Sequence, residues 1–333
     1  MGGTTGMERR IVGGRIPYYG IPTGKLRRYF SFENLRDLFR VAAGIVRAWA
    51  LVRGLRPDVL FSKGGFVSVP PVIAAKLLGV PVVSHESDAD PGLATRINAR
   101  FSDQMCVAYE STRRCFHRRY RNRVTVTGNP LRNEILRGNR VDGLRFLGFS
   151  VTDPRPVVLF LGGSLGARQI NELVEQLLPA IGSTWRVVHQ TGTTHRAGIR
   201  RDDHYAASYF GPELPDILAA ADLVVCRAGA STLWEVAVLG IPMLLVPLAG
   251  GSRGDQIRNA AVFARAGAAV SLHSSETLAG DATAWLARYA CDKDQMQRMG
   301  ERARALVRSD AADRIADIII GCLGSVPAFS RGA

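Results

Sequence analysis

The chain reads Leu223-Val224-Val225-Cys226 and then Arg227-Ala228-Gly229-Ala230-Ser231-Thr232-Leu233-Trp234-Glu235. The apolar run predicts a buried parallel strand, because such strands are covered on both faces. The small residues Gly229 and Ala230 let a ligand approach the backbone where this strand ends. Either of the next two hydroxyl residues can cap the helix that follows, and Glu235 is expected in its first turn. Since N–H groups at a helix start can bind a phosphate and a carboxylate can hold a ribose diol, the pattern favours a nucleotide-sugar donor.

Strands and helices alternate in two stretches of the chain. In the first, strands are expected at 58–61, 80–84, 104–108 and 124–127, with helices at 69–78 and 92–101. In the second, strands are expected at 156–161, 185–190, near Tyr209, at 223–226 and at 243–246, with helices at 167–178, 214–220 and 232–239. This alternation predicts an α/β protein with two doubly wound, Rossmann-like domains and a ligand cleft between them. The last predicted helix, near residues 310–321, can pack on either domain.

The charge of the chain is unusual, whereas its composition is that of an ordinary globular protein. With 43 Lys and Arg against 29 Asp and Glu, the net charge is +14. Nucleic acid, an anionic membrane surface or a strongly anionic substrate would each account for this excess. The five cysteines form no CxxC pair, which indicates a reduced, cytoplasmic protein without disulfides or a zinc site. The N-terminus lacks the apolar core of a signal peptide, so we expect none. Charge or proline interrupts the apolar runs, so we expect no transmembrane helix.

Two glycine-rich turns each follow a predicted strand and open a helix. Gly162–Arg168 places glycine N–H groups where they could bind a diphosphate, and Ser164 adds a hydroxyl. Lys63–Ser68 has the same position in the first stretch, and Lys63 adds positive charge. Both patterns are also typical of tight turns that bind nothing, so the spacing alone leaves both interpretations open.

Polar residues follow the predicted strand at 80–84. His85 and Glu86 can act as a general base or contact a sugar, and the alternative is that they cap the next helix. Arg132, near the crossing between the two stretches, can grip a phosphate or can be an ordinary surface arginine. The other histidines have no metal-like spacing, so no metal site is expected.

A basic and aromatic segment leads into a predicted amphipathic helix that reaches Trp49. It comprises Lys25, Leu26, Arg27, Arg28, Tyr29, Phe30, Ser31 and Phe32. Cations mixed with aromatic side chains fit docking on an anionic bilayer, and they also fit nucleic acid. The helix itself is expected to bury its apolar residues and to leave its arginines in water. We therefore predict membrane contact for the segment at 26–32.

The order and spacing of these motifs resemble the MurG family of bacterial transferases, glycosyltransferase family 28. The likeness spans about residues 3–308 and is carried by residues 23–30, 61–70, 85–88, 128–130, 162–168, 226–235 and 252–256. It implies the GT-B fold, in which two Rossmann-like doubly wound parallel-sheet domains face a cleft. The acceptor and membrane-facing domain would be residues 1–133 with a C-terminal helix at 309–325, and the UDP-sugar donor domain would be residues 134–308.

The resemblance also implies an activity and a location. Such an enzyme would transfer N-acetylglucosamine with inversion from UDP-N-acetylglucosamine to lipid I, the undecaprenyl-diphospho-MurNAc-pentapeptide, forming lipid II for peptidoglycan. It would need no metal or other cofactor and would bind no nucleic acid. Because the acceptor is a lipid, the enzyme would lie peripherally on the anionic cytoplasmic face of the bacterial cell membrane.

Carried over residue by residue, the resemblance implies two sets of ligand contacts. The donor would meet Asp88, Arg132, Ser164, Gly211, Gly229, Ala230, Ser231, Thr232, Leu233, Glu235, Asp255 and Gln256. Within this set, Arg132 and Ser164 would contact UDP, and the backbone near Phe210 and Gly211 would frame the uracil. Glu235 would hold the ribose, while Asp255 and Gln256 would hold the sugar. The acceptor diphosphate would lie toward Lys63, Gly64, Gly65 and Ser68.

This sequence departs from the family pattern at two places. Asp88 stands where the family usually has an asparagine, which adds a charge and removes a hydrogen-bond donor. Family members also begin with a strand and a glycine-rich loop containing a histidine, and nothing of that kind precedes Gly2. His85 and Glu86 are therefore the candidate bases in the acceptor half. The alternatives are a diacylglycerol glycosyltransferase of the same fold and a UDP-sugar-binding remnant without turnover.

Overall fold

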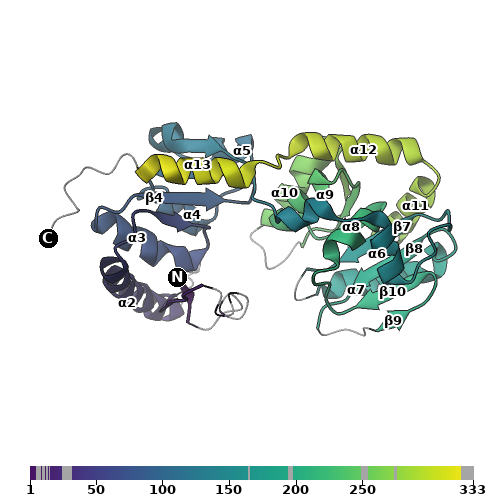
Figure 1. The fold of residues 1–333 in the computed structure, drawn as a ribbon, viewed down its shortest axis with the longest axis horizontal. Coiled ribbons are helices and arrows are strands. Elements are labelled where there is room, and N and C mark those ends of the chain that lie inside the picture. Colours follow the sequence, from purple (N-terminus) through teal and green to yellow (C-terminus); the bar gives the residue numbers. More distant parts are fainter. Residues whose placement is uncertain are drawn as a thin grey trace. The chain divides into compact units, whose positions relative to one another are not determined.

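The computed structural model describes residues 1–4, 9, 12, 14, 16–24, 32–163, 166–193, 198–248, 254–273 and 276–323, with the backbone alone for 32–38 (Figure 1). The chain forms two compact units. Unit 1 holds Met1–Gly128 together with the segment that begins at Ala311, and unit 2 holds Asn129–Asp310. Residues 129–133, which the sequence placed with the first domain, belong to unit 2 by their contacts.

Unit 2 is built on one sheet whose strands are parallel except at one edge. The strands are β7 (Val157–Leu161), β8 (Arg186–Gln190), β9 (Ile199–Arg200), β10 (His204–Ala207), β11 (Leu223–Cys226), β12 (Met243–Leu245) and β13 (Ala269–Ser271). Their order is β13-β12-β11-β7-β8-β10-β9, and β9 pairs antiparallel with β10. The strand expected near Tyr209 lies earlier, at His204–Ala207, and β9 and β13 were not predicted. The parallel α/β class is confirmed.

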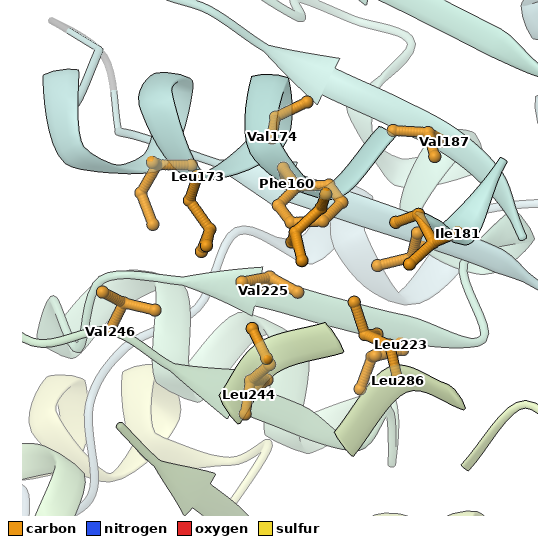
Figure 2. Close-up of a cluster of buried hydrophobic side chains, with 14 of the residues drawn as sticks. Phe160, Leu173, Val174, Ile181, Val187, Leu223, Val225, Leu244, Val246 and Leu286 are labelled. Atoms are coloured by element: carbon orange, nitrogen blue, oxygen red, sulfur yellow. The ribbon is translucent and has the colours of Figure 1, made fainter. Parts of the chain in front are cut away.

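Helices cover the sheet of unit 2. They are α6 (Arg140–Leu147), α7 (Arg168–Ile181), α8 (Leu214–Ala220), α9 (Ala230–Val238), α10 (Asp255–Arg265), α11 (Leu278–Tyr289) and α12 (Lys293–Leu306), and the 3₁₀ segment η3 spans Asn133–Arg137. In Figure 2, Leu173 and Val174 of α7 lie against Phe160 of β7. Leu286 of α11 joins the same buried cluster. Apolar residues at helical spacing on α7 therefore bury one face of the sheet.

Unit 1 holds a second parallel sheet. Its strands are β3 (Leu60–Ser62), β4 (Val82–Glu86), β5 (Gln104–Val107) and β6 (Val124–Val126), in the order β3-β4-β5-β6. Its helices are α2 (Phe32–Leu55), α3 (Val69–Leu77), α4 (Leu93–Asn98), α5 (Glu110–Arg114) and α13 (Ala311–Leu323), with 3₁₀ segments η1 (Phe66–Ser68) and η2 (Arg118–Arg123). A separate parallel pair, β1 (Gly2–Gly3) and β2 (Gly20–Ile21), lies in the same unit.

The two faces of the unit 1 sheet have different covers. Val82 packs in a cluster with Val72 of α3, whereas the next residue, Val83, packs with Ile315 of α13. Successive side chains of a strand point to opposite faces, so α3 and α13 lie on opposite sides of the sheet. Figure 1 shows α13, in yellow, running beside this sheet although it comes from the far end of the chain.

The β3 edge of this sheet is open. A cavity of about 590 Å³ is lined by Leu60 and Phe61 of β3 and by Gly2 and Tyr18 from the β1–β2 region. Phe61 is 41% exposed, and among the described residues no strand pairs with β3 on this side. Across the described ranges, no helix combines the length and the apolar character that a membrane span requires.

Candidate functional site

The sheet of unit 2 has a topological switch point between β7 and β11. These strands are neighbours, yet the chain runs from β7 outward through β8 to β10 and then returns to β11 and runs outward through β12. The loops that leave the carboxyl ends of β7 and β11 therefore diverge. In open α/β sheets this divergence opens the crevice where ligands bind.

The turn after β7 is built around glycines that no other residue could replace without strain. Gly166 has a φ of +80°, and a Cβ there would lie 2.6 Å from the Thr191 carbonyl oxygen. Gly163 has a φ of +84° with open space around it. The turn thus packs against the end of β8 at Gly166 and leaves room beside Gly163. Ser164, the predicted hydroxyl ligand, lies outside the described residues.

The turn after β11 differs from expectation in its capping. Helix α9 begins at Ala230 with Gly229 as its N-cap, and no side chain caps it, so the prediction that Ser231 or Thr232 caps the helix is wrong. Glu235 consequently lies in the second turn of α9, not in the first. A Cβ at Gly229 would meet nothing within 4 Å, so the start of α9 opens onto space that a ligand phosphate could occupy.

The α9 residues of the predicted donor set face different ways. Ser231 is exposed and Thr232 is half-buried, whereas Leu233 is buried and its N–H donates to the Gly229 carbonyl. Leu233 therefore contributes to the packing and hydrogen bonding of α9, and its side chain is not exposed to a ligand.

Arg132 and Glu235 form a bidentate ion pair. Arg132 Nε donates to Glu235 Oε1 at 2.7 Å, and Nη2 donates to Oε2 at 2.9 Å. The hydrogen bonds to Glu235 raise the pKa of Arg132 above its ordinary value, although burial acts in the opposite direction. The carboxylate is mostly covered while half of the arginine side chain is exposed. Two predicted donor ligands, distant in sequence, are thus brought together, and each presents a charged group that a nucleotide could bind.

Helix α10 carries two further donor candidates, Asp255 and Gln256. Asp255 starts the helix and pairs with Arg258, and Gln256 Oε1 accepts a 2.8 Å hydrogen bond from the Leu248 N–H. Asn259, a residue that was not predicted to belong to the site, donates to the Ala228 carbonyl at 3.2 Å. Because Ala228 lies in the turn after β11, this bond holds α10 beside the switch point.

The residues near Gly211 are linked to the turn after β7 by a side chain that sequence reasoning missed. Gln190, the last residue of β8, donates to the Gly163 carbonyl at 3.0 Å and accepts from the Phe210 N–H at 3.2 Å. A polar residue at the carboxyl end of a predicted buried strand was the signal that could have identified it.

The candidate residues of unit 1 also form a cluster. His85 is 0% exposed and its Nε2 donates to the Gly128 carbonyl at 2.9 Å, which leaves Nδ1 as the acceptor for Lys63 Nζ at 3.0 Å. Lys63 Nζ also donates to Ser87 Oγ at 3.1 Å. Burial, reinforced by the nearby Lys63 charge, lowers the pKa of His85 to about 4. Desolvation lowers the pKa of Lys63 to about 8. The positive charge of the pair therefore resides on Lys63, and both ring nitrogens of His85 are already in use.

Glu86 holds the loop that follows β4. Its Oε1 accepts from the Asp88 N–H at 3.1 Å, and its Oε2 accepts from the Gly92 N–H and from Thr95 Oγ1. Burial raises the pKa of this carboxyl above its ordinary value. Oε1 retains capacity for a further hydrogen bond. Asp88 itself belongs to unit 1, unlike the rest of the predicted donor set.

The predicted acceptor turn is tightly organised. Gly64 and Gly65 have positive φ values of 87° and 78°, which favour glycine. Ser68 Oγ donates to the Gly65 carbonyl at 2.7 Å and accepts from Asn98 Nδ2 at 2.7 Å. The Ser68 hydroxyl thus shapes the turn in which Lys63 is presented.

Helix α2 has one buried face and one exposed face. Ala48 and Val52 are buried, and Ala48 packs with Ile21. On the exposed face Phe39 is 70% exposed and Val46 is 69% exposed, so the expectation that this helix buries its apolar residues is wrong for these two. Arg53 lies 5.4 Å from the ring centre of Trp49, which is itself exposed. Lys25, Leu26, Arg27, Arg28, Tyr29 and Phe30 lie outside the described residues, and Phe32 is described only in its backbone.

The buried, neutral His85 makes unit 1 sensitive to acid. Because its folded pKa of about 4 lies below the unfolded value of 6.5, its stabilising contribution is complete above about pH 6.5 and is lost as the pH falls toward 4. A shift of this size corresponds to about 3 kcal/mol between pH 7 and pH 4. We expect His85→Gln, whose amide can still donate to Gly128 and accept from Lys63, to remove most of that acid loss. Hydrogen exchange of β4 and β5 amides measures it.

Glu86 titrates in the opposite sense, because its folded pKa is raised, so the comparison between His85→Gln and the unaltered chain isolates the histidine. Equal acid sensitivity in the two proteins would contradict the prediction.

Comparisons with known proteins agree with this architecture. Residues 157–315 match the glycosyltransferase family 28 C-terminal domain, and residues 1–107 match the glycosyltransferase family 28 N-terminal domain. Within the part of the chain that the structure describes, no three His, Cys, Asp or Glu side chains lie close enough together to hold a metal ion.

Two relatives extend the match to most of the chain. A Treponema denticola protein named UDP-N-acetylglucosamine--N-acetylmuramyl-(pentapeptide) pyrophosphoryl-undecaprenol N-acetylglucosamine transferase is 42% identical over 292 residues, covering 81% of this chain and 74% of the relative. A Bacillus cereus protein of the same name, numbered 2, is 44% identical over 280 residues, covering 83% of this chain and 78% of the relative.

Solved structures share the fold. Acinetobacter baumannii MurG superimposes with a TM-score of 0.70 at 25% identity, covering 96% of this chain and 89% of that one. A Neisseria meningitidis UDP-GlcNAc 2-epimerase bound to UDP-GlcNAc matches at a TM-score of 0.60 and 12% identity, with 89% and 83% covered, which is a likeness of fold. With both domain types matched in order along its length and with relatives above 40% identity, the chain has the GT-B fold and belongs to glycosyltransferase family 28.

Proposed function

We propose that this chain is an inverting hexosyltransferase that moves N-acetylglucosamine from UDP-N-acetylglucosamine to lipid I and so forms lipid II for peptidoglycan. The observation that carries the proposal is 42–44% identity, over four fifths of the chain, to relatives named for that transfer. The net charge of +14 supports it, because donor and acceptor are both diphosphates.

In the proposed donor site, UDP binds at the switch point of unit 2. The start of α9 at Gly229 and the turn at Gly163 receive the diphosphate, since both expose backbone to open space. Arg132 contacts a phosphate, and Glu235 contacts the ribose hydroxyls. The two side chains already form an ion pair with each other, so the donor binds to groups that are held in place before it arrives. The backbone beside Gly211 frames the base, and Asp255 with Gln256 holds the sugar. Asp88 remains in the donor set as an implication of the family resemblance.

In the proposed acceptor site, Lys63 presents its charge to the acceptor diphosphate from the turn that contains Gly64, Gly65 and Ser68. The acceptor hydroxyl oxygen attacks the anomeric carbon on the face opposite UDP, the bond from that carbon to UDP breaks, and the hydroxyl proton passes to a base. Of the two candidate bases, Glu86 retains an acceptor position at Oε1, whereas His85 has both nitrogens engaged. We therefore propose that Glu86 is the base that accepts the proton, and that His85 positions Lys63.

The test is transfer of labelled sugar from UDP-N-acetylglucosamine to a lipid I analogue, with diacylglycerol as a competing acceptor. We expect label in the lipid I analogue and no effect of diacylglycerol. Label in diacylglycerol would replace the proposed acceptor. A folded chain that binds UDP and transfers nothing to either acceptor would instead favour the UDP-sugar-binding remnant.

We further propose that the protein lies peripherally on the anionic cytoplasmic face of the membrane and that the exposed apolar residues of α2 contact the lipid together with the segment at 25–32. Phe39 and Val46 lie seven residues apart, about two helical turns, and therefore on one side of α2. Arginines on the same helix, including Arg40, Arg47 and Arg53, supply charge for anionic headgroups.

Replacing both Phe39 and Val46 by serine is expected to weaken binding to vesicles that contain anionic lipid by about tenfold or more, because each buried apolar side chain contributes roughly 1.5–3 kcal/mol. Co-sedimentation with vesicles measures the effect. Leu77→Ser is the matched control, since Leu77 is 70% exposed on α3 of the same unit. If this control loses binding to the same degree, the assignment to α2 fails.

A further inference from the structure

Gln190 joins two turns that the sequence places far apart. It is 5% exposed at the carboxyl end of β8, and each end of its amide bonds to a different backbone group. Nε2 donates to the carbonyl of Gly163 in the turn after β7, and Oε1 accepts from the N–H of Phe210 in the segment after β10. The side chain therefore spans from the proposed diphosphate turn to the proposed base pocket.

The carboxyl end of β8 is held in place by contacts on both sides. The Thr191 N–H donates to the Ala207 carbonyl, and the Thr191 carbonyl accepts from Asn171 Nδ2 on α7 at 2.9 Å. Gly166 packs directly on that carbonyl. On the other side, Phe210 is 1% exposed and its ring stacks on Tyr205 with centroids 6.2 Å apart. With β8 held in this way, the Gln190 amide bonds to both turns from one point on the strand.

Glutamine suits this place because its amide both donates and accepts. The Gly163 carbonyl also accepts from the Gly166 N–H, but that bond lies within the turn and does not tie it to β8. A carboxylate at position 190 would still accept from Phe210 and would face the Gly163 carbonyl with a second acceptor. The two contacts can thus be separated by changing a single functional group.

We propose that Gln190 is a positioning residue for the nucleoside diphosphate: it fixes the spacing between the turn at Gly163, which receives the diphosphate, and the backbone at Phe210 and Gly211, which receives the base. This inference rests on the proposed function of the donor site. Gln190 has no part in the chemical step and makes no direct contact with the ligand in this proposal. It acts by aligning the two backbone segments that do contact the ligand.

The experiment compares UDP and uridine binding to the full chain by calorimetry and by competition. Gln190→Glu is expected to weaken UDP binding by about tenfold or more and to leave uridine binding unchanged, since the Phe210 contact persists and the Gly163 contact does not. Gln190→Leu is expected to weaken both ligands. Equal binding of UDP to Gln190→Glu and to the unaltered chain would overturn the proposal, as would a parallel loss of UDP and uridine in that variant.

A structural readout and a control keep the test independent of activity. Hydrogen exchange at the Phe210 amide is expected to stay slow in Gln190→Glu and to accelerate in Gln190→Leu. Val188→Ala, on the same strand at 0% exposed, removes packing without touching either turn. Suppose that Val188→Ala and Gln190→Glu lower the melting temperature equally and also weaken UDP binding equally. Gln190 would then act only through stability, and the proposal would be wrong. UDP binding needs no acceptor, so failed transfer to lipid I with UDP binding intact would count against the proposed function alone.

Discussion

Glu235→Ala is expected to lower kcat/KM for UDP-N-acetylglucosamine by about a hundredfold or more. The substitution removes the proposed ribose ligand, and it also deprives Arg132 of the two hydrogen bonds, at 2.7 and 2.9 Å, that orient its guanidinium. Each hydrogen bond from a ribose hydroxyl to a carboxylate contributes about 1.5–3 kcal/mol, and each 1.4 kcal/mol is a tenfold change, so losing two such bonds accounts for a hundredfold effect. Steady-state kinetics at varied donor concentration, together with UDP binding by calorimetry, measures the loss.

Asp142→Ala provides the matched control for Glu235. Asp142 pairs with Arg145 on α6 of the same unit, but both side chains are more than half exposed and the contact is longer, at 3.4 Å. Exposed pairs of this kind contribute roughly 0–1 kcal/mol, so this variant should retain nearly full activity. A small effect of Glu235→Ala, comparable with that of Asp142→Ala, would remove Glu235 from the donor site.

Gly166→Ala is expected to destabilise unit 2 by about 3 kcal/mol or more and to abolish tight UDP binding. The left-handed conformation at φ +80° costs a side chain roughly 1–2 kcal/mol. In addition, the new Cβ would lie 2.6 Å from the Thr191 carbonyl oxygen and 2.9 Å from the Gly192 Cα, so the turn must move away from β8. For a domain of this size, the loss corresponds to a fall in melting temperature of about 6–12 °C.

Gly163→Ala separates strain from collision. Its φ of +84° is similar, but a Cβ there would meet no atom within 4 Å. We expect a destabilisation of about 1–2 kcal/mol from conformational strain alone. Scanning calorimetry of the two variants, each with and without UDP, distinguishes them, and equal melting temperatures would refute the idea that Gly166 locks the turn to β8.

The alternating pattern of apolar runs and turns was sufficient to predict the parallel α/β class and the place of most strands in unit 2. The reason is that a strand buried on both faces must be apolar throughout, as in Val157–Leu161 and Leu223–Cys226, and this requirement is local. Short strands escaped prediction. Ile199–Arg200 and Ala269–Ser271 carry too few residues for a pattern and are strands because a neighbour offers hydrogen bonds.

Capping shows where local rules fail. Ser231 and Thr232 are strong candidates for an N-cap by residue type, yet α9 begins at Ala230, two residues before the predicted start, and its N-cap is Gly229. The start of the helix is set by core packing, which buries Ala230, Leu233 and Trp234. The two hydroxyl residues consequently lie inside the first turn and not at the cap position. Tertiary contacts thus override a local preference that contributes about 1 kcal/mol.

The sequence by itself determined the family, the parallel-sheet architecture and the positions of the glycine turns, because these depend on the order of residues along the chain. Only the tertiary structure decided how the side chains pair. It joined Arg132 to Glu235 and buried both nitrogens of His85 against Gly128 and Lys63. It also placed Gln190 between two turns. Each of these contacts spans 20 to 103 residues of chain. Contacts over such separations depend on how the sheet places its strand ends, which no local pattern of residues reports.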